Sequence, residues 1–261
     1  MSKSDEPAPP GTAGMVRCNP LRPEPSDSTA HTRRPDQSDA WLIIPVYNEA
    51  PVIASVVDNA VLHFPNVVCV DDGSRDQSAD QIATTSAHLV RHPVNLGQGA
   101  AVQTGVEYAR KQPGAEFFVT FDADGQHQVD DVLRMLRRLR TEAIDIVLGT
   151  RFHGDISHIP RLKRVVLKTA IKFSPRGRRL GLSDSHNGLR AFNRKVADEM
   201  DITSNGMGHA VEIVEMIDTK GWQVAEEPVS ILYTDYSVAK GQSLLNGVNI
   251  LFDSAVRGNR H

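Results

Sequence analysis

The sequence predicts an α/β domain with a mostly parallel sheet flanked by helices. Between residues 41 and 152, short apolar runs alternate with helical patterns of ten or more residues, which is typical of parallel sheets. Polar residues cluster after several of the apolar runs, and the ligand sites of open parallel sheets lie at the carboxyl ends of strands. The chain has 261 residues, of which 40% are hydrophobic and 23% charged, as expected of an ordinary globular domain.

The elements follow one another in order along the first half of the chain. Strands are expected at 41–46, 66–74, 88–92, 116–125 and 143–152, where the residues are mainly apolar. Helices are expected at 47–64, 75–87, 95–111 and 129–140, where apolar residues recur with helical spacing. The alternation then breaks, and a helix at 207–221 and a strand-like segment at 222–233 follow.

Composition divides the chain into three parts. Residues 1–39 hold seven of the fifteen prolines and much Ser, Asp and Thr, so we expect a disordered tail that cannot bury a core. Residues 40–245 form the predicted folded domain. Residues 246–261 complete a C-terminal amphipathic helix or tail.

Charge and cysteine content exclude several classes of protein. The net charge of −3 gives no global attraction to nucleic acid. Cys18 and Cys69 lie far apart, without zinc-site spacing, so we expect reduced thiols in a reducing compartment. The chain has no apolar run of about 18 residues and no signal-peptide pattern. A cytoplasmic protein is expected, in contact at most with a membrane surface.

Two carboxylates follow the apolar run FFVTF. If the strand pleat continued, Asp122, Asp124 and Gln126 would share one face, because side chains at i and i+2 do so. Hard cations such as Mg²⁺ and Mn²⁺ prefer oxygen ligands of this kind together with phosphate oxygens. A polar turn at Gly125 that caps the next helix is the alternative interpretation.

Two further motifs follow predicted strands. Asp72, in the segment DDGS, can make an ordinary turn or can bind the base or ribose of a nucleotide. The Gly-x-Gly of NLGQGAA, at 95–101, precedes a predicted helix, as phosphate-binding loops do. It lacks the third glycine and the lysine of the known phosphate-binding fingerprints, so loop flexibility is an equal alternative.

A basic segment occupies residues 156–183, with eight Lys or Arg and no Asp or Glu. Its apolar residues, from Leu162 to Phe173, fall on one face of a helix, while residues such as Arg161 and Arg164 lie elsewhere. A helix of this kind can lie in a membrane interface and attract anionic headgroups. Packing of the apolar face on the domain is the alternative.

Five motifs, IIPVYNE, VVCVDDGSRD, NLGQGAA, TFDADGQH and LGTRF, occur in this order. Together they resemble family 2 glycosyltransferases of the Rossmann-like GT-A fold, over about residues 41–245. Within that family, the basic segment and the segments SDSHNGLRAFNR and YSVAKGQS look like polyprenyl-phosphate sugar synthases of the dolichyl-phosphate mannose synthase type. The variants HNGLRA and KGQS look most like bacterial polyprenyl-phospho-N-acetylgalactosaminyl synthases.

The resemblance implies a role for individual residues. The positions that match the donor-binding residues are Pro45, Tyr47, Glu49, Val70, Asp72 and Ala123. The positions that match the metal and diphosphate site, for Mg²⁺ or Mn²⁺, are Asp122, Asp124 and Gln126. With both aspartates, Arg151 and Lys240 match catalytic positions. Residues expected on the acceptor-phosphate side are Arg161, Arg164, Asp184 and Arg190.

The implied reaction is an inverting transfer of a sugar from a nucleotide donor to polyprenyl phosphate at the cytoplasmic face of the membrane. An N-acetylhexosamine from a UDP-sugar, GalNAc or GlcNAc, is the expected cargo. Mannose or glucose is an alternative, although Thr234 replaces an arginine of the mannose synthases. A second alternative is transfer to a glycan hydroxyl, with Asp184 as general base. In that case Asp184→Asn would nearly abolish activity, whereas it would be harmless to transfer onto polyprenyl phosphate. A nucleotide-sugar sensor without activity is the non-enzyme alternative.

The C-terminal stretch 243–256 carries an apolar stripe from Leu244 to Ala255. It either folds back on the sheet or docks onto the bilayer or a small membrane protein. The resemblance favours such a membrane partner by analogy, because related synthases work with one.

Overall fold

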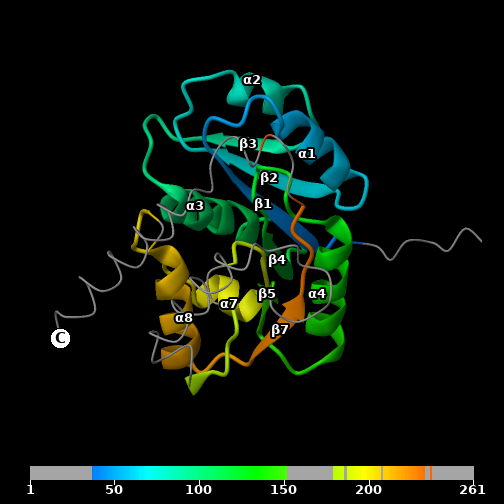
Figure 1. Ribbon diagram of the computed structural model, residues 1–261, viewed down its shortest axis with the longest axis vertical. Coiled ribbons are helices and arrows are strands. Elements are labelled where there is room, and N and C mark those ends of the chain that lie inside the picture. Colours follow the sequence, from blue (N-terminus) through cyan, green and yellow to red (C-terminus); the bar gives the residue numbers. More distant parts are fainter. Residues whose placement is uncertain (1–36, 152–178, 185–186, 207, 233–235, 237–261) are drawn as a thin grey trace, which may run out of the picture. The chain divides into compact units, whose positions relative to one another are not determined.

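The computed structural model describes residues 37–151, 179–184, 187–206, 208–232 and 236 (Figure 1). These residues belong to one unit, Asp36–His261. Several predictions lie outside the described residues. They are the tail at 1–36, the basic segment at 156–178 with Arg161 and Arg164, residue Lys240, and the apolar stripe at 243–256.

A sheet of seven strands forms the centre of this unit. The strands are β1 (Ala40–Val46), β2 (Asn66–Asp71), β3 (His88–Arg91), β4 (Phe117–Thr120), β5 (Ile146–Thr150), β6 (Arg190–Asn193) and β7 (Val224–Pro228). Their order in the sheet is β3-β2-β1-β4-β6-β5-β7. Strand β6 runs antiparallel to both neighbours, whereas the other pairs are parallel. The predicted mostly parallel sheet is confirmed.

Helices cover both faces of the sheet (Figure 1). The described helices are α1 (Ile53–Val61), α2 (Ser78–Ala83), α3 (Gln98–Arg110), α4 (Val129–Thr141), α7 (Arg194–Glu199) and α8 (His209–Lys220). Helices α1, α2 and α4 contribute to the apolar core on one face, and α3, α7 and α8 to that on the other. The alternation of β1 explains this arrangement, because Leu42 and Ile44 point into the first core and Ile43 into the second.

The helix predicted at 47–64 is shorter than expected, because residues 47–52 form a loop before α1. Asn48 adopts a positive φ of 55°. The backbone N–H groups of Asn48 and Glu49 donate to the hydroxyls of Ser74 and Ser78, at 2.9 and 2.8 Å. The side chains of Ser74, in the loop after β2, and of Ser78, at the start of α2, thus hold this segment out of a helix.

Two strands, β2 and β4, end several residues earlier than predicted. Strand β2 ends at Asp71 and β4 at Thr120, so the polar residues that follow lie in loops at the edge of the sheet. The antiparallel strand β6 had no counterpart among the predicted elements. Within the described residues, no helix combines the length and apolarity that crossing a membrane requires.

Candidate functional site

Several of the predicted site residues lie at one edge of the sheet. Tyr47 follows β1, Asp72 follows β2, Asp122 follows the end of β4, and Arg151 follows β5. These strands are parallel, so their carboxyl ends point the same way. Because β6 is antiparallel, its first residue, Arg190, lies at this same edge. The topology therefore brings to one edge acidic and basic residues that are up to 118 positions apart in the chain, from Asp72 to Arg190.

Asp122 is surrounded by nitrogen groups. His127 Nε2 donates to its Oδ2 at 2.8 Å, and Gln98 Nε2 lies 3.4 Å from its Oδ1. Burial would raise the pKa of Asp122, but the charge and hydrogen bond of His127 and the charge of Arg190 lower it below its ordinary value. The side chain is still 31% exposed. Asp122 is therefore an ionised carboxylate with access to a ligand.

Asp124 has the opposite electrostatic environment. Burial and the negative charge of Asp122 raise the pKa of Asp124 above its ordinary value. A cation next to the two carboxylates would relieve this repulsion, so the donor set fits Mg²⁺ or Mn²⁺. Among the described residues, no group of three His, Cys, Asp or Glu side chains is placed to hold a metal ion. The remaining ligands of such an ion would come from substrate oxygens or water.

The strand pleat does not continue to Gln126, so the prediction that the pleat makes this residue a third metal ligand is wrong. The pleat ends at Thr120, and Gly125 turns the chain with a φ of 74°. The Gln126 side chain is buried, its backbone N–H donates to Asp124 Oδ1 at 3.1 Å, and its carbonyl accepts from Leu232. The turn interpretation thus describes the backbone here, while the role that the resemblance gives Gln126 stays a prediction.

Gly188 packs directly against the Asp122 carboxylate. A Cβ at this position would lie 2.4 and 2.6 Å from the two carboxylate oxygens. Thr120 Oγ1 donates to the Gly188 carbonyl at 2.6 Å and fixes the glycine beside the end of β4. Only a residue without a side chain fits here.

Arg190 is a buried cation between two acids. It is 2% exposed, and burial lowers its pKa to about 10 against the opposing charges of Asp122 and Asp184. Burial and the charge of Arg190 lower the pKa of His209 to about 4, so that imidazole is neutral at pH 7.

Three buried nitrogen atoms at this edge have no hydrogen-bond partner among the described residues. They are His127 Nδ1, Asn187 Nδ2 and Arg190 Nη2, on side chains that are at most 5% exposed. An unpaired buried polar group costs about 1–3 kcal/mol. Their presence next to exposed carboxylate surface is typical of a site that a polar ligand completes.

Asp72 binds protein groups in this structure. Its carboxylate accepts from His92 Nδ1 at 2.7 Å and from the backbone N–H groups of Leu96 and Gly97 at 2.9 and 2.7 Å. Gly97 has a φ of 100°, which an L side chain rarely adopts. The NLGQGAA loop is thus pinned by Asp72, and two N–H groups that a phosphate would use are already paired.

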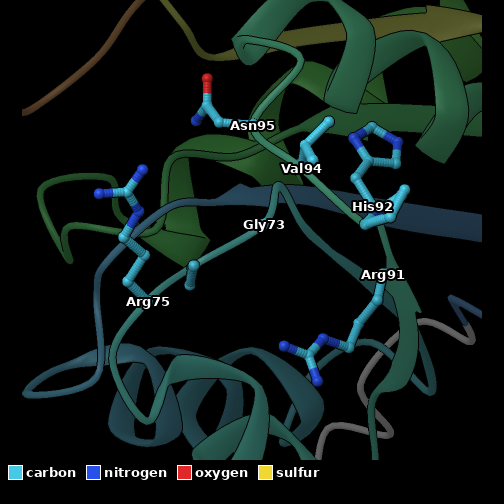
Figure 2. A pocket seen from close by; sticks show the side chains of 8 residues that line it. Gly73, Arg75, Arg91, His92, Val94 and Asn95 are labelled. Carbon is cyan, nitrogen blue, oxygen red and sulfur yellow. The ribbon is translucent and has the colours of Figure 1, made fainter.

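A cleft of about 520 Å³ opens between the loops that follow β2 and β3. Figure 2 shows Arg75 and Arg91 on two sides of Gly73, with Asn95 from the second loop. Arg91 pairs with Asp71 at 3.0 Å and remains 57% exposed. Because His92 both lines the cleft and bonds Asp72, the cleft lies beside the predicted donor site and offers positive charge to an anion.

The other predicted donor residues differ in exposure. Tyr47 is 41% exposed, whereas Val70 and Ala123 are buried, so their side chains cannot reach a ligand in this structure. Pro45 pairs in register with Val70 and is half-buried. Glu49 accepts a hydrogen bond from the Tyr236 hydroxyl at 2.8 Å, which links the loop after β1 to the C-terminal part of the chain.

Arg151 is held by Asp184. Arg151 Nε and Nη2 donate to the two carboxylate oxygens of Asp184 at 2.6 and 2.8 Å, and the Arg151 N–H adds a third contact at 3.2 Å. Asp184 is 1% exposed. Both its oxygens are therefore occupied, which disfavours the hypothesis that Asp184 is a general base. Because Asp184 also holds Arg151, Asp184→Asn is now expected to affect either reaction, so this variant does not distinguish the two acceptors.

Sequence reasoning missed three residues of the site. His127 lies in the motif TFDADGQH but received no role, and Gly188 was not singled out. Glu226, which accepts a hydrogen bond from the Ser183 N–H, was only part of a strand-like segment. For His127 the signal was its place five residues after Asp122. Nothing local in the sequence shows that Glu226 or Gly188 meets residues more than 40 or 60 positions away.

Comparisons with known proteins show which family the chain belongs to. The model of glycosyl transferase family 2 matches residues 41–201. UDP-N-acetylglucosamine–dolichyl-phosphate N-acetylglucosaminyltransferase of Methanococcus voltae is 30% identical, over 81% of this chain and 93% of the relative. Polyprenol monophosphomannose synthase of Mycolicibacterium smegmatis is 29% identical, over 84% of this chain and 85% of the relative.

A solved structure shows the same fold. Glucosyl-3-phosphoglycerate synthase from Mycobacterium tuberculosis, crystallised with Mn²⁺ and UDP-glucose, matches with a TM-score of 0.64 and 16% sequence identity. The match covers 84% of this chain and 77% of that protein. The expected GT-A fold is thereby confirmed.

Proposed function

The chain belongs to glycosyl transferase family 2 and is a glycosyltransferase, and we propose that it transfers a sugar from a nucleotide-sugar donor to polyprenyl phosphate. The observation that carries the proposal is the meeting, at one sheet edge, of the Asp122–Asp124 pair with the anchored Arg151. The pair suits a metal-bound diphosphate, and the arginine suits a second phosphate.

On the donor side, Asp122 and Asp124 would hold Mg²⁺ or Mn²⁺, which would neutralise the leaving nucleoside diphosphate as a Lewis acid. The proposed nucleoside position is beside Tyr47 and Asp72, where Arg75 of the neighbouring cleft can donate to the base, ribose or phosphate.

On the acceptor side, Arg151 is proposed to bind the lipid phosphate. A phosphate monoester is largely ionised at pH 7, so its oxygen can attack the anomeric carbon without a protein base. The new bond forms as the bond to the diphosphate breaks on the opposite face, which inverts the configuration. The protein contributes positioning and charge neutralisation, with Lys240, outside the described residues, as a further proposed cation.

The proposed sugar is an N-acetylhexosamine carried by UDP. The relative from Methanococcus voltae, whose name specifies UDP-N-acetylglucosamine and dolichyl phosphate, supports this choice. The mannose synthase from Mycolicibacterium smegmatis has similar identity and supports mannose as the alternative. Parallel assays with UDP-GlcNAc, UDP-GalNAc, UDP-glucose and GDP-mannose would decide between them.

The proposed place of action is the inner surface of the cell membrane, because the acceptor is a lipid. The basic segment at 156–183 would supply the electrostatic attachment. Sedimentation with vesicles of anionic and of neutral lipid tests this step: the protein should bind the anionic vesicles at low salt and leave them at high salt. Binding that depends on neither the lipid charge nor the salt concentration would contradict electrostatic attachment.

A further inference from the structure

Strand β7 carries two adjacent glutamates that point to different surroundings, as successive side chains of a strand do. Glu227 pairs with Arg134 of α4 at 3.1 Å and with Arg138 at 3.4 Å. Glu226 instead faces the turn at 183–184. The two glutamates lie on the same strand and are both partly buried, but they have different hydrogen-bond partners.

Glu226 is bonded to the backbone of that turn. Its Oε1 accepts from Ser183 N–H at 2.8 Å and from Asp184 N–H at 3.0 Å, and its Oε2 lies 3.0 Å from Ser183 N. A carboxylate that accepts several backbone N–H bonds makes strong, charge-assisted contacts. The position of the turn thus depends on a side chain from another strand, about 40 residues away.

The turn at 183–184 also holds Arg151. Ser183 Oγ bonds Thr150 Oγ1 at 2.7 Å, and the Asp184 carboxylate grips the Arg151 guanidinium through two bonds. A two-point contact between planar groups fixes orientation as well as distance. A small shift of the turn would therefore rotate or displace the guanidinium.

We propose that Glu226 is a positioning residue for the transfer reaction, which sets Arg151 for the acceptor phosphate through the 183–184 turn. This inference rests on the proposed function, in which Arg151 binds the phosphate of the lipid. Glu226 itself touches no reacting atom. Its effect on the reaction passes through Asp184 to the Arg151 guanidinium.

The test compares Glu226→Leu and Glu226→Gln with Glu227→Leu, using undecaprenyl phosphate in detergent, a UDP-sugar and Mn²⁺. Glu226→Leu should raise the KM for undecaprenyl phosphate roughly 10- to 100-fold, the range expected when a charged hydrogen-bond group is lost. The KM for the UDP-sugar should stay within about twofold. Glu226→Gln keeps one acceptor oxygen, so its KM should fall between those of Glu226→Leu and the unchanged protein.

Glu227→Leu is the matched control. It removes two ion pairs to α4 and should lower the unfolding temperature while leaving the acceptor KM unchanged. A merely structural role of Glu226 would give the same pattern as this control, because a smaller folded fraction lowers the apparent kcat and alters neither KM. That outcome for both Glu226 variants would overturn the inference.

Arg151→Met separates the inference from the proposed function. If Arg151→Met raises the acceptor KM and Glu226→Leu does not, the positioning role is wrong and the proposed function stands. If Arg151→Met leaves the acceptor KM unchanged, the phosphate-binding role of Arg151 is wrong, and the inference fails with it.

Discussion

Replacing Gly188 by alanine tests whether the Asp122 carboxylate is the centre of the site. The new Cβ would lie 2.4 Å from Oδ2, 2.6 Å from Oδ1 and 2.8 Å from the carboxylate carbon. Ordinary contacts begin at about 3.4 Å, so the carboxylate must retreat by roughly 1 Å. Gly188 itself cannot easily yield, because its carbonyl is held by Thr120 and β6 follows two residues later.

A misplacement of about 1 Å at a reacting centre costs about 100-fold in rate. We therefore expect kcat/KM for the nucleotide sugar to fall about 100-fold, with a higher Mn²⁺ concentration for half-maximal activity. Overpacking should cost about 1–3 kcal/mol of stability, which leaves the protein folded. Steady-state kinetics with a Mn²⁺ titration and a thermal melt measure all three quantities.

Gly206→Ala is the matched control, since a Cβ there meets no atom of the described residues within 4 Å and the φ of Gly206 is not positive. This variant should keep normal activity. Wild-type kcat/KM and wild-type Mn²⁺ dependence in Gly188→Ala would refute the assignment of Asp122 to the reacting centre.

Three further changes have expected outcomes. Asp124→Asn should lower kcat/KM at least about 1000-fold. The same variant should melt higher than the unchanged protein in EDTA at pH 7, because the raised pKa of Asp124 marks its ionised form as unfavourable in the folded state. This gain should disappear as the pH falls through that pKa, and an unchanged melt would contradict the electrostatic argument. Asp184→Asn should raise the acceptor KM roughly 10- to 100-fold by loosening Arg151, and an unchanged KM would contradict that role. Burial raises the pKa of Cys69 to about 12, so the Cys69 peptide should stay unalkylated at pH 8 in native protein and react in guanidinium; rapid native alkylation would show that this core strand opens.

Much of the fold could be predicted from local sequence. The apolar runs of β1 and β2 and the periodic pattern of α4 are strong signals, since each buries its apolar residues as its period requires. The loop segments were harder to predict. Asn48 and Glu49 lie in a helix-like pattern, but the hydroxyls of Ser74 and Ser78 accept hydrogen bonds from their N–H groups and keep these residues out of the helix.

The residues of the candidate site also differ in how far the sequence predicts them. Asp122 and Asp124 were predicted from the apolar strand before them, Arg151 was predicted from the family resemblance, and the topology places all three at one edge. The partners of these residues could not be predicted, because they come from distant segments. Asp184 was visible as an acid, yet nothing near it in the sequence shows that its carboxylate pairs with Arg151 or that its N–H donates to Glu226. The residues that position a site are set by tertiary contacts that leave no local pattern.

The proposed function requires that this glycosyltransferase uses polyprenyl phosphate as its acceptor. The most direct measurement incubates the purified protein with Mn²⁺, undecaprenyl phosphate and each radiolabelled nucleotide sugar, then extracts the lipid and analyses the product by mass. We expect label in the lipid phase from a UDP-N-acetylhexosamine, a product mass equal to that of undecaprenyl phosphate plus one sugar residue, release of UDP, and loss of the reaction in EDTA. No lipid-linked label from any donor, together with transfer to a glycan hydroxyl, would contradict it.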